Sequence, residues 1–436
     1  MNDIDTLRSI KYGDSKEFSL PLAVSEQAPG LFECLTITRC LPGKRISCIG
    51  RWQGNTIFAK FFIDPKRAKI HWQKEKQGYQ LLNTQQVPAP QILHFGIHNG
   101  IYFILFEFLK NTTPLKEIWL NSNESQRTQL LTQLTTTLAE HHEKGIIQQD
   151  LHLNNFLFSN EQVYTVDGAD ISLFDPTDRQ TASNNIALLF AQFFPANDKK
   201  IGLALDHYLA LRNWPSSQQL IDQIKTSTLR IREKRKKDRL DKTQRSCSLF
   251  EFHHSWDQLT ICSRKFQSAD MRAFLQSPDS FIAKGESLKR GNTCTVATVT
   301  IDNKIRVVKR YNIKNWRHFL SRALRPTRAI SSWSNAHLLQ FYGISSPEPI
   351  AVIERRWGPF RKTAYYLSEL SQGEPGGDFF HSEKIPQLDK QTAADSTINL
   401  INSLHSLNIS HGDLKISNFI IFGLKTSIID LDSMKQ

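Results

Sequence analysis

Two stretches of the chain carry the same pattern of residues, and this pattern indicates both the fold and the chemistry. The first is His142-Glu-Lys-Gly-Ile-Ile-Gln-Gln-Asp150-Leu-His-Leu-Asn-Asn155-Phe, and the second is His405-Ser-Leu-Asn-Ile-Ser-His-Gly-Asp413-Leu-Lys-Ile-Ser-Asn418-Phe. In both, a His precedes the first Asp by eight residues, an Asn follows it by five, and a further Asp follows it by seventeen. One Asp-x-x-x-x-Asn is expected by chance, but two matched copies indicate an internal duplication.

The local sequence predicts how each copy brings its polar residues together. Gly145 and Asn408 follow apolar-periodic helices, at a position where a left-handed residue commonly ends a helix. A loop with Asp and Asn comes next, and then two short apolar runs that predict a hairpin ending at Asp167 or Asp430. Since a hairpin returns its end close to its beginning, the Asn and the second Asp are expected to meet above the loop Asp.

This layout is that of kinase phosphoryl transfer, in which one Asp orients a hydroxyl while an Asn and a second Asp hold Mg²⁺. Asp150 and Asp413 are therefore the candidate catalytic residues. The candidate metal ligands are Asn155 and Asp167 in the first copy and Asn418 and Asp430 in the second.

Kinase chemistry also needs a Lys on the phosphates of ATP and a Glu to hold it. Lys60 and Lys309 each end an apolar strand upstream of their motif, and Glu75 lies in the helix predicted after Lys60. The matching helix of the second copy offers Asn335 and no acid. Further candidates for nucleotide contact are Glu107 and Glu369, at the ends of two matching apolar strands.

Composition describes an ordinary protein of 436 residues, 39% hydrophobic and 22% charged. Neither a secretory signal nor a membrane-spanning run is evident, and six cysteines without metal-site spacing predict reduced thiols in the cytoplasm. The net charge of +13 favours a polyanionic partner. Its densest part, 230–245, is either a solvated linker helix or a segment that lies against anionic lipid; nucleic acid is disfavoured because no aromatic residues interleave with the charges.

We therefore expect an α+β protein with two tandem kinase-like domains, each with a β-rich N-lobe and a helical C-lobe. The predicted parts are an N-terminal segment (1–28), domain 1 (29–228), a basic linker (229–264) and domain 2 (265–436), the last with a truncated C-lobe because the sequence stops six residues after Asp430.

At these residues the chain resembles the bacterial lipopolysaccharide core kinases, which phosphorylate Kdo or heptose in the inner core. The stretches that carry this resemblance are Leu41-Pro-Gly-Lys-Arg45, Trp52-Gln-Gly54 with Phe58-Ala-Lys60, Asp150-Leu-x-x-x-Asn155, Arg322-Ala-x-Arg-Pro326 and Trp333-x-Asn-Ala-His337. The resemblance implies ATP and Mg²⁺ as cofactors, a lipid-anchored glycan as substrate, and a place at the inner face of the cytoplasmic membrane.

Each copy departs from the kinase pattern differently. The first has Gln148 where a loop His is usual, and the second keeps His411 but lacks the helix Glu. The first copy is therefore expected to be the active kinase, and the second either a degenerate partner or a second active site. Two other readings stay open: a tandem pseudokinase that acts as a scaffold for envelope biosynthesis, and a kinase of a small-molecule or protein acceptor.

Overall fold

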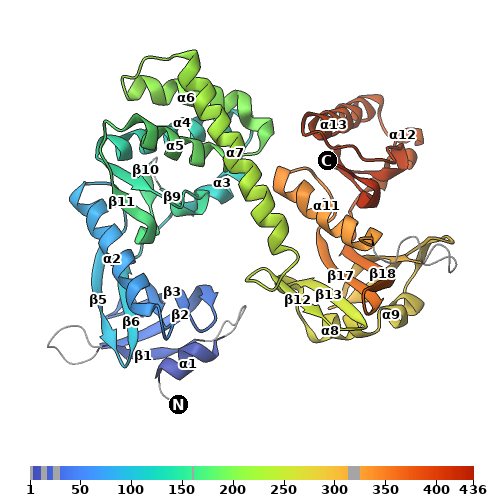
Figure 1. Ribbon diagram of the computed structural model, residues 1–436, viewed down its shortest axis with the longest axis horizontal. Coiled ribbons are helices and arrows are strands. Elements are labelled where there is room, and N and C mark those ends of the chain that lie inside the picture. The colour runs from blue at the N-terminus through green and yellow to red at the C-terminus, as the bar shows by residue number, and fades with distance from the viewer. Residues whose placement is uncertain (1–2, 11–16, 23–29, 160–161, 313–324) are drawn as a thin grey trace. The chain divides into compact units, whose positions relative to one another are not determined.

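The computed structural model describes residues 3–10, 17–22, 30–159, 162–312 and 325–436, and it divides into two compact units (Figure 1). Unit 1 is Met1–Arg232 and unit 2 is Glu233–Gln436. Both mix helices with antiparallel sheets, so the prediction of an α+β protein is confirmed. Part of the Arg322–Pro326 motif lies outside the described residues.

Unit 1 begins with a six-stranded antiparallel sheet in the order β1-β2-β3-β4-β6-β5. Its elements are α1 (Asp3–Ser9), β1 (Ser19–Leu22), β2 (Gly30–Leu41), β3 (Arg45–Trp52), β4 (Asn55–Phe62), α2 (Ala68–Thr84), β5 (Ile92–His98) and β6 (Ile101–Glu107). Because side chains alternate along a strand, β4 and β6 supply two apolar layers. One layer packs against α1 and the other against α2.

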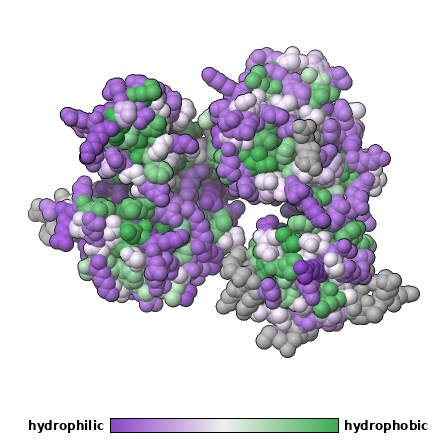
Figure 2. Space-filling model, turned by 180° about the vertical axis from the view of Figure 1, so that it is seen from behind, coloured by the Kyte–Doolittle hydropathy of each residue, from purple (hydrophilic) through white to green (hydrophobic). Residues whose placement is uncertain are grey.

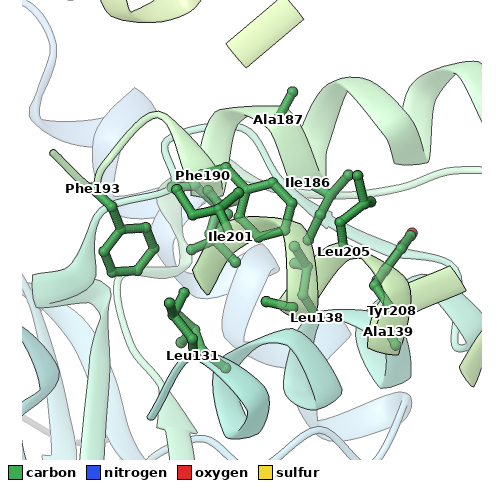
Figure 3. Packing of buried hydrophobic residues seen from close by; sticks show 14 of the residues in the cluster. Leu131, Leu138, Ala139, Ile186, Ala187, Phe190, Phe193, Ile201, Leu205 and Tyr208 are labelled. Atoms are coloured by element: carbon green, nitrogen blue, oxygen red, sulfur yellow. The ribbon is translucent and has the colours of Figure 1, made fainter. Parts of the chain in front are cut away.

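The rest of unit 1 is mainly helical. It comprises β7 (Thr113–Pro114), α3 (Leu115–Asn121), α4 (Glu124–Glu143), β8 (Ile146–Gln148), η1 (Leu153–Asn155), β9 (Phe156–Ser159), β10 (Gln162–Thr165), η2 (Gly168–Asp170), β11 (Ile171–Leu173), α5 (Arg179–Phe190), η3 (Pro195–Asn197), α6 (Asp198–Leu211) and part of α7 (Gln218–Lys242). Helix α4 starts with a capping box between Asn123 and Gln126. Its leucines pack with α5 and α6 in one core (Figure 3).

Unit 2 repeats the order of a sheet followed by helices. Its seven-stranded antiparallel sheet has the order β12-β13-β17-β18-β16-β15-β14. Its elements are β12 (Phe250–His254), β13 (Gln258–Ser263), η4 (Arg264–Phe266), α8 (Ala269–Gln276), α9 (Pro278–Lys284), β14 (Ser287–Arg290), β15 (Cys294–Ile301), β16 (Lys304–Tyr311), α11 (Arg328–Tyr342), β17 (Pro349–Trp357), β18 (Phe360–Glu369), β19 (Glu374–Pro375), α12 (Gly376–His381), α13 (Gln387–Ser406), η5 (Ile416–Asn418), β20 (Phe419–Phe422), β21 (Lys425–Ile428) and η6 (Leu431–Ser433).

The prediction that the segment 229–264 is a basic linker has to be corrected. Its first part is helical, as the solvated-helix interpretation expects, but it belongs to the continuous helix α7. Its last part forms β12 and β13, and β13 pairs with β17 inside the sheet of unit 2. Phe250 and Ile261 are buried there. The high charge of 230–245 concealed a short apolar alternation just downstream.

Polar side chains cover much of the surface seen in Figure 2, with separate apolar patches between them. Among the described residues, no helix combines the length and the apolar character needed to span a bilayer.

Candidate active sites

Lys60 of β4 is the centre of the polar cluster in unit 1. Its ammonium group donates a hydrogen bond to Glu75 of α2 and lies 3.4 Å from the Asp167 carboxylate. The Glu75 side chain is fully buried, and its Oε1 atom also accepts a hydrogen bond from the backbone N–H of Gly168, at 3.2 Å. The structure thus brings together three predicted site residues that are up to 107 positions apart in the sequence.

The charges of this cluster support one another in a site removed from water. Burial by itself would lower the pKa of Lys60, but Glu75 and Asp167 outweigh it and raise that pKa above its usual value. Burial likewise opposes ionisation of Asp167, yet Lys60 and Arg45 lower its pKa overall. At neutral pH Lys60 is therefore positively charged and Asp167 negatively charged.

A close approach of two backbones places Asp167 beside α2. A Cβ atom on Gly78 of α2 would lie 1.7 Å from the carbonyl oxygen of Gly168, so only glycine fits there. Asp167 itself has a φ of 71°, in the left-handed region that non-glycine residues seldom adopt. Its N–H donates to the Tyr79 hydroxyl at 3.1 Å, which helps to hold this conformation.

The loop of unit 1 presents Asp150 to solvent next to these residues. The Asn155 side-chain amide donates to the backbone oxygen of Asp150 at 2.8 Å. The backbone N–H of Val166 in turn donates to the backbone oxygen of Asn155, also at 2.8 Å. The predicted hairpin β9–β10 thus brings the second Asp back to the loop. The pKa of Asp170 agrees with the closeness of Asp150 and Asp167. It is raised first by burial and then by the negative charges of these two residues.

Several polar residues that the sequence did not single out hold this loop. His142, predicted only as part of the repeat, is buried and contacts the Tyr208 hydroxyl at 2.6 Å and the Asn185 amide at 3.0 Å. Asn185 then donates to the backbone oxygen of Gln148 at 2.8 Å. Gln192 donates to the backbone oxygen of Leu151. Asn185 lies on α5, Tyr208 on α6, and Gln192 just after the end of α5; no sequence motif marks these partners.

Unit 2 repeats the geometry of the loop. Asn418 donates to the backbone oxygen of Asp413 at 2.8 Å, and the N–H of Ile429 donates to the oxygen of Asn418 at 2.9 Å. Asp430, like Asp167, is left-handed, with a φ of 66°. The Lys309 ammonium lies 2.9 Å from its carboxylate. Burial raises the pKa of Asp430, but Lys309 overcomes this and lowers it below the usual value.

The two loops use different side chains for the same contact. The Gln148 amide donates to the oxygen of Val166 at 3.3 Å, and the His411 ring lies 3.0 Å from the oxygen of Ile429. Each acceptor is the residue just before the second Asp. The missing loop His of the first copy is thus replaced by an amide with the same partner.

Helix α11 of unit 2 contacts the segment after the second Asp through different side chains than α2 does in unit 1. Asn335, at the position matched to Glu75, donates to the backbone oxygens of Leu431 and Met434, at 2.7 and 3.3 Å. Arg328 pairs with Asp432 at 2.7 Å. Among the described residues of unit 2, the ion-pair partner of Lys309 is Asp430.

Two predicted nucleotide contacts, and the first His of the second repeat, do not join these clusters. Glu107 turns to the start of β5, where its carboxylate accepts from the N–H of Gln91 at 3.1 Å. Glu369 is exposed at the end of β18. His405, which matches buried His142 by spacing, is exposed and has no comparable network among the described residues.

The residues present fit a magnesium ion. Carboxylate and amide oxygens are the ligands that Mg²⁺ prefers, and it is commonly held by one or two carboxylates together with substrate phosphates. Asp167 and Asn155 would supply such oxygens in unit 1, and Asp430 and Asn418 in unit 2. Among the described residues, no group of three or more His, Cys, Asp or Glu side chains forms a separate metal cage.

A lysine paired with an Asp, beside an Asp–Asn loop, is the arrangement that the kinase prediction requires. Residues 274–436, which include Lys309, Asp413, Asn418 and Asp430, match the lipopolysaccharide kinase (Kdo/WaaP) family. The predicted family is thereby confirmed for this part of the chain, and so is the prediction of a kinase, because the family is one of phosphotransferases. No curated protein matches the chain significantly.

Proposed function

We propose that the chain is an ATP- and Mg²⁺-dependent kinase of a sugar hydroxyl, heptose or Kdo, in the lipopolysaccharide inner core, and that unit 1 is its working catalytic unit. Each unit would then be a kinase-like domain with a sheet lobe and a helical lobe, acting at the inner face of the cytoplasmic membrane. The observation that carries the proposal is the placement of Lys60 between Glu75 and Asp167, next to the Asp150 loop.

The residues of unit 1 can divide the reaction among them. Lys60, held by Glu75, would bind the phosphates of ATP. Asp150, whose side chain is 57% exposed, can accept a hydrogen bond from the acceptor hydroxyl and take its proton as the phosphoryl group transfers. His152 lies 3.0 Å from Asp150 and orients its carboxylate. A metal ion bound by Asp167 and Asn155 would neutralise charge on the phosphates.

A second candidate assigns catalysis to unit 2 as well. The family match falls on unit 2, where Lys309 pairs with Asp430 and the Asn418 amide donates to the backbone oxygen of Asp413. Lys415 pairs with Asp413 at 2.7 Å, where unit 1 has His152. Against this candidate stands Asn335, which leaves Lys309 without a helix acid.

The test is calorimetric binding of ATP with Mg²⁺ to the full chain and to Asp167→Ala and Asp430→Ala, followed by phosphate transfer to isolated inner-core glycan. The proposal expects Asp167→Ala alone to lose metal-dependent binding and transfer. Loss of one site by each variant would make both units kinases. No binding by the wild type would favour the pseudokinase scaffold, and transfer only to a small molecule or protein would change the acceptor.

A further inference from the structure

Two neighbouring hairpin turns of unit 2 expose tryptophans. Trp256, in the turn between β12 and β13, is 70% exposed, and Trp357, the last residue of β17 before the turn into β18, is 59% exposed. Phe360 stacks on Trp357 with ring centroids 5.9 Å apart. An exposed tryptophan is unusual because it leaves a large apolar ring in water. We call these three residues and Gly358 the tryptophan tip.

The two turns are fastened together. The N–H of Gly358 donates to the oxygen of Trp256 at 2.9 Å, and that of Arg356 to the oxygen of Asp257 at 2.7 Å. The Trp256 ring lies directly over Gly358, because a Cβ atom there would be 2.7 Å from it. Gly358 has a φ of 56°, which further favours glycine. The rings therefore sit on a fixed backbone, and their binding would cost little conformational entropy.

The charge around the tip is positive. Arg355, Arg356, Arg361 and Lys362 adjoin it, against the acids Glu354 and Asp257. Glu354 is buried and already neutralised, since Arg356 lies 2.6 Å and Arg361 3.3 Å from its carboxylate. Asp257 accepts a hydrogen bond from Ser255. Four cations against two anions leave an excess of two positive charges.

Projecting aromatic rings with cations beside them fit an anionic membrane better than a protein surface. Tryptophan favours the membrane–water boundary, where its ring meets apolar chains and its N–H meets headgroups. Arginine and lysine add attraction to anionic lipid. The matching turn of unit 1, His98-Asn99-Gly100, has no aromatic residue.

From this geometry we infer that the tryptophan tip of unit 2 inserts into the headgroup region of an anionic bilayer. The inference is independent of the proposed kinase activity, because the contact needs neither nucleotide nor acceptor. The proposed membrane contact lies on these two hairpin turns and not on the basic segment 230–245.

The experiment measures binding of the full chain, without ATP, to vesicles of phosphatidylglycerol and phosphatidylcholine by sedimentation. The double variant Trp256→Ser/Trp357→Ser should bind at least ~10-fold more weakly, from the loss of apolar contact. Lys362→Glu should weaken binding at least about fivefold, and more so at low salt. Leu388→Ala, which alters a side chain 78% exposed on α13, is the matched control and should bind like the wild type.

Brominated lipid supplies a second readout, because it quenches only tryptophans that enter the bilayer. Quenching should be present in the wild type and lost in the double variant, with thermal melts showing that both are folded. Full vesicle binding by the double variant would overturn the inference. So would a wild type that ignores vesicles, in which case the tip is a docking site for a protein or glycan. Phosphate transfer to a delipidated acceptor, measured in parallel, tests the kinase proposal separately.

Discussion

The two units hold their lysines differently while building the same loop. In unit 1 Lys60 is shared between Glu75 and Asp167, whereas in unit 2 Lys309 pairs with Asp430 and helix α11 offers only Asn335. Yet the contacts from Asn155 to Asp150 and from Asn418 to Asp413 have the same length, 2.8 Å. The loop geometry is therefore independent of the helix acid, and two repeats that look alike in sequence can differ in how many acidic partners hold the strand lysine.

The largest expected effect separates the two loops directly. Asp150→Asn should lower kcat for phosphate transfer on the order of 10²–10⁴-fold, because the acceptor proton loses its base. Asp413→Asn, the matched change in unit 2, should leave kcat within a few-fold. A steady-state assay with ATP and inner-core glycan measures both. Equal losses in the two variants would break the comparison, since both units would then be catalytic.

The next effect concerns the helix acid. Glu75→Gln leaves Lys60 buried with Asp167 as its remaining acidic partner, and removing one partner of a buried ion pair typically costs about 3–5 kcal/mol. We expect a loss near the lower end, because Asp167 stays. Urea denaturation followed by hydrogen exchange of peptides from each unit measures it.

The matched variant in unit 2 is Asn335→Ala, which removes two hydrogen bonds but no charge. Its cost should be about 1–3 kcal/mol, confined to peptides of unit 2. A smaller loss for Glu75→Gln than for Asn335→Ala would contradict the view that the Lys60 cluster is the tighter of the two.

The third effect is on stability against pH. Burial lowers the pKa of His141 to about 3 and of His142 to about 4 in unit 1, and of His337 to about 3 in unit 2. Between these values and about 6.5, the unfolded chain binds protons that the folded chain does not. Stability must therefore be full above about pH 6.5 and fall as the pH drops.

The slope should be about 1.4 kcal/mol per pH unit for each buried histidine, so it should be steeper in unit 1 than in unit 2. Hydrogen exchange at pH 6.5 and at pH 5 measures each unit. His141→Gln should reduce the slope of unit 1 alone. Equal slopes in the two units of the wild type would contradict the assignment.

The smallest effect tests the substitution of Gln148 for a loop His. Gln148→Ala should cost about 0.5–1.5 kcal/mol, the net value of one hydrogen bond to Val166. Gln148→His should restore that contact, as His411 makes it in unit 2. Thermal melts of the two variants provide the measurement, and a histidine variant no better than alanine would show that the two loops are not interchangeable.

The sequence alone predicted the loop residues and the hairpins that follow them. Both Gly145 and Asn408 have the expected left-handed backbone, with φ of 68° and 55°. Such features depend on near neighbours: a helix end, a turn, and an alternation of apolar residues. Glu75 was also predicted from sequence, because its helix follows the Lys60 strand after a short connection.

Only the tertiary structure determined the contacts between residues that lie far apart in the sequence. The partners of His142, namely Tyr208 and Asn185, lie 66 and 43 positions away. Strands β12 and β13 were assigned to a linker because their short apolar alternation gains its meaning only from pairing with β17, about 90 residues downstream. The tryptophan tip likewise depends on two turns whose tryptophans, Trp256 and Trp357, are 101 positions apart. Long-range packing selects such partners from many equivalent candidates, and sequence spacing does not distinguish among them.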